Sequence, residues 1–92
     1  MLVGVPKEIK KMENRVGLVP ASVRELVHHG HKVLVEHNAG AGVGIGDAAY
    51  KKAGAAIAGN AAEVFKKAEM IVKVKEPQPQ ECKMLRKGQV LF

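Results

Sequence analysis

Two basic residues in this 92-residue chain follow short apolar segments, and both have side chains suited to binding small anions. Arg15 lies ten residues after the apolar segment Leu2–Val5, and Lys75 directly follows the segment Met70–Val74. The planar guanidinium of an arginine matches a carboxylate through two parallel hydrogen bonds, whereas a lysine ammonium acts as a point charge that can polarise a carbonyl oxygen. Arg15 and Lys75 are therefore candidate substrate-binding residues, and Lys75 is also a candidate catalytic residue.

The elements that must position these residues alternate regularly between strand and helix. The apolar runs predict strands at residues 2–5, 32–36, 55–58, 70–74 and 89–92, and the apolar stripes and caps predict helices at residues 20–29, 48–53, 61–68 and 80–87. Parallel strands require crossover connections, so this order predicts an α/β fold with a parallel sheet and helices on both faces. The expected fold is Rossmann-like or flavodoxin-like, a single partial domain over residues 1–92, truncated at about the fifth strand.

Ligands of such sheets gather outside the carboxyl ends of the strands, where the segments bearing Arg15 and Lys75 both lie. Even with one strand between them, the two strand ends would be about 10 Å apart, within joint reach of two long side chains. A small 2-oxo acid could bridge them. Spacing alone nevertheless favours the simpler alternative, in which the two residues are unrelated surface cations.

Two other motifs are weaker candidates for chemistry. The glycine-rich segment Gly40–Gly46 lacks the spacing of the dinucleotide fingerprint and follows the second predicted strand rather than the first, so we predict a surface loop and no cofactor-binding residue. The histidines cluster near a predicted helix end without the spacing of metal ligands, which favours structural or solvent-exposed roles and no metal site. They are His28, His29, His31 and His37.

The composition limits the classes of partner and the cell compartment that we expect for this protein. The formal charge is +6, but the lysines are spread over nearly every predicted element and aromatic residues make up only 3% of the chain, which argues against a nucleic-acid surface. A single cysteine, Cys82, fits a reducing compartment. No apolar run approaches the length of a membrane-spanning helix. We therefore expect a cytoplasmic protein without nucleic-acid or membrane partners.

Several blocks resemble the N-terminal part of alanine dehydrogenase, and the α subunit of NAD(P) transhydrogenase begins similarly. These blocks cover residues 4–8, 13–16, 30–36, 39–42, 49–55 and 73–77. The block Lys73-Val74-Lys75-Glu76-Pro77 favours alanine dehydrogenase. The chain departs from the resemblance at Gly17, where alanine is more usual, and at Val19, where we expect a helix-capping threonine. Both departures are expected to loosen the segment that carries Arg15.

The resemblance implies an NAD-dependent enzyme that interconverts L-alanine with pyruvate and ammonia by hydride transfer. It implies that Arg15 holds the substrate carboxylate and that Lys75 contacts the carbonyl or amino-bearing carbon. In this family NAD binds to a separate, later Rossmann domain, and the acid/base histidine follows the position of Phe92. We therefore expect the chain to bind no cofactor by itself and to be inactive in isolation, because it lacks a hydride carrier and a proton donor.

Two alternatives remain open at this point. The chain could be the corresponding part of a transhydrogenase, whose partner would be a membrane-embedded proton-translocating component. It could also be a stand-alone, noncatalytic binding or interaction module. In that case the strand edge left without a partner domain must be covered, because unpaired edges and apolar faces promote association. We therefore also expect the isolated chain to self-associate.

Overall fold

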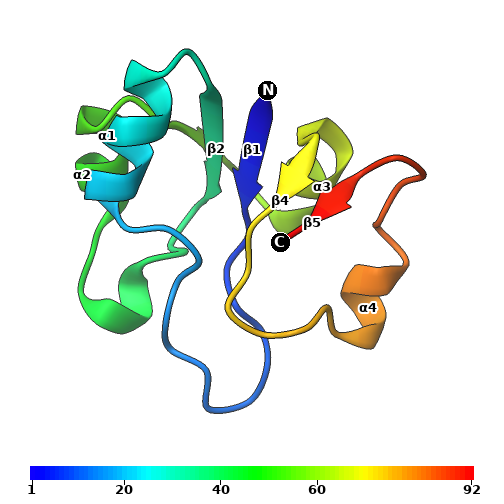
Figure 1. Ribbon diagram of the computed structural model, residues 1–92. Coiled ribbons are helices and arrows are strands. Elements are labelled where there is room, and N and C mark those ends of the chain that lie inside the picture. The colour runs from blue at the N-terminus through cyan, green and yellow to red at the C-terminus, as the bar shows by residue number, and fades with distance from the viewer.

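The computed structural model describes residues 1–92 and contains one five-stranded sheet in the order β3-β2-β1-β4-β5, with every neighbouring pair parallel (Figure 1). The strands are β1 (Leu2–Val5), β2 (Lys32–Glu36), β3 (Ala56–Ala58), β4 (Met70–Ile71) and β5 (Val90–Leu91). The helices are α1 (Pro20–His28), α2 (Asp47–Lys52), α3 (Ala61–Lys67) and α4 (Pro79–Cys82), with a 3₁₀ turn η1 at Ala41–Val43. The predicted Rossmann-like α/β fold is thus confirmed.

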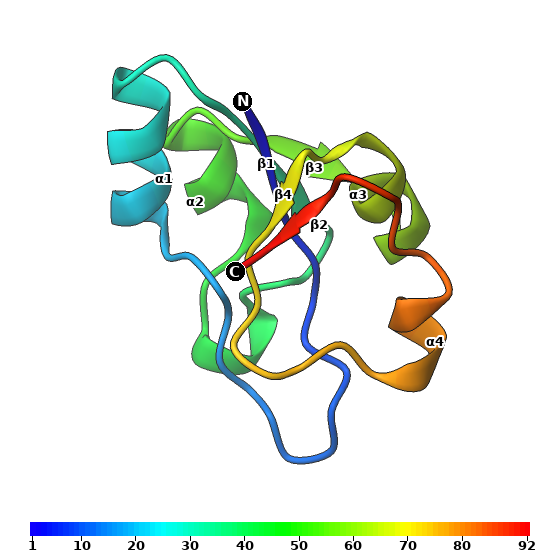
Figure 2. The ribbon, with the colours of Figure 1, turned by 45° about the vertical axis from the view of Figure 1, so that its right-hand side comes forward.

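Helices cover both faces of the sheet, as the alternation of elements predicted (Figure 2). α1 and α2 lie on one face, where the fully buried side chains of Val23 and Tyr50 pack with the valines of β1 and β2. α3 lies on the other face, where Val64 and Phe65 pack against Ile71 of β4. Apart from Tyr50 and Phe65, the buried core consists of small aliphatic side chains.

The order in which strands are added to the sheet reverses at β1, and this places the candidate site at the carboxyl ends of the central strands. The chain runs from β1 outward through β2 and β3 and then returns to the opposite side of β1 as β4. β1 and β4 are therefore direct neighbours, paired through Val3–Met70 and Gly4–Ile71, with no strand between them. The carboxyl ends of the strands at such a reversal form the usual ligand-binding crevice of open α/β sheets.

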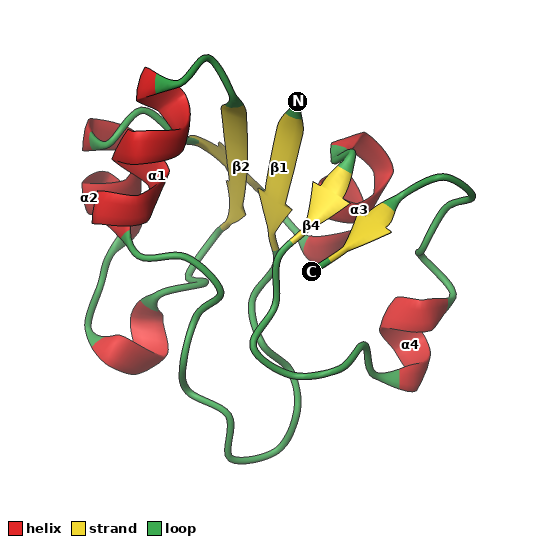
Figure 3. Ribbon diagram, viewed as in Figure 1, coloured by secondary structure: helices red, strands yellow, loops and turns green.

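Two long loops extend from these two strand ends and lie side by side (Figure 3). The β1–α1 loop covers residues 6–19, and the β4–α4 loop covers residues 72–78. An ion pair between Lys10 and Glu76 joins them at the surface. We call these segments the first and second loop.

The first loop is packed against its neighbours at three places. A Cβ atom added at Gly17 would lie 2.5 Å from the Val72 carbonyl oxygen, and one added at Gly42 would lie 2.5 Å from the Asn14 carbonyl oxygen, so both glycines permit close approach of backbone. The phenol of Tyr50 donates a 2.7 Å hydrogen bond to the Leu18 carbonyl. The glycine-rich segment is thus a tight turn that supports the first loop.

Candidate carboxylate-binding site

A buried carboxylate connects the first loop to the second. Glu8, just beyond β1, accepts hydrogen bonds from the backbone N–H groups of Val74 (2.9 Å) and Lys75 (3.2 Å). It also accepts one from the Lys73 ammonium at 3.1 Å, and Glu81 lies 3.1 Å from the same ammonium. The side chains of Glu8, Lys73 and Glu81 are at most 2% exposed. This cluster fixes the backbone of Lys75 relative to the end of β1.

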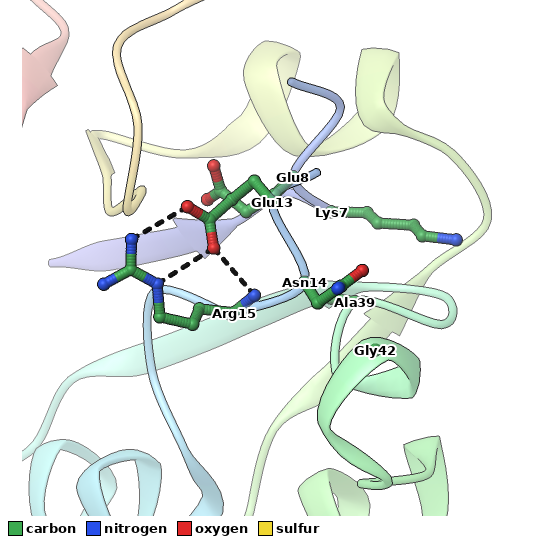
Figure 4. A pocket seen from close by; sticks show the side chains of 7 residues that line it. All are labelled: Lys7, Glu8, Glu13, Asn14, Arg15, Ala39 and Gly42. Atoms are coloured by element: carbon green, nitrogen blue, oxygen red, sulfur yellow. Dashed lines mark hydrogen bonds and ion pairs between the residues drawn. The ribbon is translucent and has the colours of Figure 1, made fainter. Parts of the chain in front are cut away.

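Arg15 is held by a second carboxylate within its own loop (Figure 4). Glu13 accepts hydrogen bonds from Nε of Arg15 at 3.0 Å, from Nη2 at 2.9 Å and from the Arg15 backbone N–H at 2.9 Å. Together these bonds fix both the loop backbone and the plane of the guanidinium. The Glu13 side chain is only 5% exposed, whereas that of Arg15 is 65% exposed.

These contacts change the ionisation of both groups. Hydrogen bonds from the Arg15 side chain and backbone, with a smaller contribution from the charge of Lys75, lower the pKa of the Glu13 carboxyl from its ordinary 4.5 to about 2. The hydrogen bond to Glu13 raises the pKa of Arg15. The pair is therefore a fully ionised, bidentate interaction at neutral pH.

A small polar cavity of about 120 Å³ opens between the first loop and the glycine-rich segment. The residues around it are Lys7, Glu8, Glu13, Asn14, Arg15, Ala39 and Gly42. Figure 4 shows the Lys7 ammonium and the Arg15 guanidinium pointing in opposite directions from it. Nη1 of Arg15 makes no hydrogen bond within the chain, so one edge of the guanidinium is available to a ligand.

Lys75 lies beside a second, larger hollow of about 340 Å³, formed by the second loop and the end of β5. Its ammonium makes no hydrogen bond or ion pair within the chain, in contrast to that of the neighbouring Lys73. Glu8 joins the two hollows, since it lines the first and binds the Lys75 backbone in the second. The structure therefore places Arg15 and Lys75 on adjoining loops at the same end of the sheet, although they line different cavities.

The carboxylates of Glu8 and Glu13 are the residues that sequence reasoning missed. Both stand in blocks of the family resemblance, Glu8 in residues 4–8 and Glu13 in residues 13–16. Only Glu13 is close in sequence to the basic residue it contacts, because Glu8 lies 67 residues from Lys75. The expectation that Gly17 loosens the first loop is not supported by the packing, because Gly17 lies directly against the Val72 carbonyl. Val19 does stand at the N-cap of α1 without a side-chain capping bond, as expected.

The dinucleotide-binding turn is not formed after β1. The segment after β1 is the long first loop rather than a glycine-rich turn that opens a helix, and Gly42 in the glycine-rich segment is packed against Asn14. No group of three or more histidine, cysteine, aspartate or glutamate side chains could hold a metal ion, and none of the four histidines lines either hollow. No helix has the length and apolar character needed to cross a bilayer.

Comparison with known proteins decides the family. The family described as alanine dehydrogenase/PNT, N-terminal domain, matches residues 4–92. The chain belongs to this family. It is 54% identical over all 92 residues to an alanine dehydrogenase of Methanococcus maripaludis and 53% identical to one of Bacillus subtilis. It spans about a quarter of the length of these curated relatives, 25% and 24% respectively.

Solved structures of the family share the fold closely. A structure titled L-alanine dehydrogenase matches the whole chain with a TM-score of 0.97 and 51% identity, the chain covering 25% of it. A transhydrogenase from Sinorhizobium meliloti matches 99% of the chain with a TM-score of 0.92 and 41% identity, the chain covering 27% of it. Both enzymes named in the family description are thus represented among the structural neighbours.

Proposed function

We propose that the first and second loops form the substrate-binding part of an NAD-dependent alanine dehydrogenase, which interconverts L-alanine with pyruvate and ammonia. The observation that carries this proposal is the arrangement of Arg15, whose guanidinium is fixed by Glu13 and keeps one edge free beside the loop of Lys75. The proposed reaction is inferred from the family membership and from the 54% identity to an alanine dehydrogenase. The exposed free Cys82 fits a cytoplasmic setting.

In this proposal Arg15 binds the carboxylate of the 2-oxo acid or amino acid, and Lys75 supplies a positive charge at its carbonyl oxygen. An ammonium without an internal partner can turn toward the oxygen and stabilise the negative charge that develops there. The two loops follow strand ends that are direct neighbours, which supports the proposal that both side chains reach one three-carbon ligand.

The chain is proposed to bind its ligand without turnover. The side chains around the two hollows include no histidine to transfer a proton, and β1 is followed by a long loop instead of the glycine-rich turn that binds a dinucleotide. NAD is proposed to bind in a Rossmann domain outside these 92 residues, which form the substrate part. Residues 1–92 would then contribute orientation and charge.

A titration of the ¹⁵N-labelled chain followed by NMR tests the proposal. Pyruvate should shift the backbone and side-chain signals of Arg15 and Lys75 saturably, whereas pyruvamide, which lacks the carboxylate charge, should not. NADH should leave the glycine-rich segment unshifted. Shifts confined to other regions, or saturable NADH binding at that segment, would contradict the proposal.

A second candidate is the corresponding part of a transhydrogenase, which the TM-score of 0.92 and 41% identity support. If the chain is part of a transhydrogenase, we expect no pyruvate-binding site at Arg15 and Lys75. Saturable pyruvate or L-alanine binding at Arg15 and Lys75 therefore favours the dehydrogenase, and its absence favours the transhydrogenase.

A further inference from the structure

The guanidinium of an arginine offers two different edges to carboxylates, and Glu13 occupies one of them. The side edge consists of Nε and Nη2, and both atoms donate to Glu13. The terminal edge consists of Nη1 and Nη2, of which Nη1 has no partner within the chain. A carboxylate ligand must therefore either displace Glu13 or approach the terminal edge.

Three observations indicate that a carboxylate ligand does not displace Glu13 from Arg15. Its side chain is 5% exposed beneath Arg15, and releasing Arg15 would remove two charge-assisted hydrogen bonds together with its counter-ion. It accepts a hydrogen bond from the Arg15 backbone as well as from the side chain. The preceding residue, Met12, has a φ angle of 70°, an unfavourable left-handed conformation for this side chain. The loop thus accepts backbone strain beside Glu13.

We infer that Glu13 is a positioning residue that fixes Arg15 by its side edge, so that the substrate carboxylate binds the terminal edge. This inference rests on the proposed carboxylate-binding function of Arg15. The inference also implies that the ligand must contact Lys75 as well as Arg15. Because Glu13 neutralises Arg15, the charge of a bound carboxylate must be balanced largely by Lys75, so a ligand needs to reach both residues.

Substitution of Glu13 distinguishes positioning from displacement, because the two predict opposite changes in affinity. If Glu13 positions Arg15, Glu13→Gln should weaken pyruvate binding roughly tenfold, a loss of about 1.4 kcal/mol. Glu13→Asp, which keeps the charge on a shorter side chain, should restore part of the affinity. If Glu13 instead competes with the ligand, Glu13→Gln should tighten binding, and this result would overturn the inference.

Glu63→Gln is the matched control, because it removes one negative charge from a distant ion pair with Lys67 on α3. It should leave pyruvate affinity unchanged if the effect at Glu13 is local. A second measurement needs no variant: the Nε–H signal of Arg15 in the wild-type chain should keep its position and slow exchange at saturating pyruvate. Loss of that signal on binding would show displacement of Glu13 and overturn the inference even if the variants fail to fold.

The outcomes also separate this inference from the proposed function. If the wild-type chain binds no pyruvate, the proposed function fails and this role of Glu13 fails with it. If the wild-type chain and the Glu63→Gln control bind pyruvate, and Glu13→Gln binds it equally well or more tightly, only the positioning role fails.

Discussion

The Lys73 ammonium lies 3.1 Å from Oε1 of Glu8, and both side chains are almost completely buried. Oε2 of Glu81 lies at the same distance from this ammonium, as an ion pair without the geometry of a hydrogen bond. The interior beneath the second loop therefore holds two carboxylates and one ammonium. Such clusters persist only when each charge is compensated by its neighbours, because removal from water is costly.

Lys73→Met should destabilise the chain strongly, since it leaves the carboxylates of Glu8 and Glu81 without their shared cation. The expected loss is about 3–5 kcal/mol in the free energy of unfolding, measured by urea denaturation. Lys67→Met is the control, because Lys67 forms an exposed pair with Glu63 and its loss should cost about 0.5 kcal/mol or less. Equal stability of Lys73→Met and the wild type would show that the buried cluster does not hold the second loop.

Gly17→Ala, which introduces the residue more usual in the family resemblance, should destabilise the chain. The added Cβ would lie 2.5 Å from the Val72 carbonyl oxygen, so the first or the second loop must shift. We expect a loss of about 1–3 kcal/mol and shifted NMR signals at Arg15. Gly59→Ala is the control, because its added Cβ meets no atom within 4 Å. A Gly17→Ala chain as stable as that control would contradict the close packing of this loop.

The Glu13 carboxyl should titrate near pH 2 rather than near its ordinary value of 4.5. A lowered pKa in the folded state means that this pair stabilises the fold above pH 4.5 and that the contribution is lost as the pH falls toward 2. Carboxyl ¹³C chemical shifts followed with pH give the pKa directly. In Arg15→Met the pKa should rise toward the ordinary value, and an unchanged low pKa would show that Arg15 is not its cause.

The chain should self-associate through β5, which has no partner on its outer edge. Val90 and Leu91 are each 44% exposed and Phe92 is 81% exposed, so the edge presents apolar side chains to solvent. Sedimentation velocity should show dimers or larger species at high concentration, and Leu91→Lys should shift the population toward monomer. A wild-type chain that stays monomeric at every concentration would count against this prediction.

The order and type of the elements could be predicted from the sequence because their signals are local. Pro20 opens α1, and Asn60 accepts the Glu63 backbone N–H at the start of α3, as capping patterns predict. The prediction was less accurate in the last third of the chain. β4 ends at Ile71 rather than at Val74. The backbone N–H of Val72 still donates to Gly4 of β1, but that of Val74 donates to Glu8 instead of to a neighbouring strand.

The last helix was also predicted too long, and the reason again lies in distant contacts. α4 ends at Cys82, and the side chains of Arg86 and Gln89 then bind the carbonyls of Phe65 and Ala68 at the end of α3. No local pattern shows such a partner.

For the site, the sequence indicated the two cations but not the carboxylates that position them. Arg15 and Lys75 could be selected by residue type and by their place after predicted strands. The roles of Glu8 and Glu13 depend on the adjacency of β1 and β4 and on the path of the first loop, which are properties of the folded chain.

We propose above that Arg15 and Lys75 bind one small carboxylate ligand together. Intermolecular NOEs from the methyl group of bound pyruvate test it most directly, since they report proximity to individual side chains. We expect NOEs to both Arg15 and Lys75 in the same complex. Saturable binding with contacts to only one of them, or to the separate hollow beside His31 and Lys67, would contradict it.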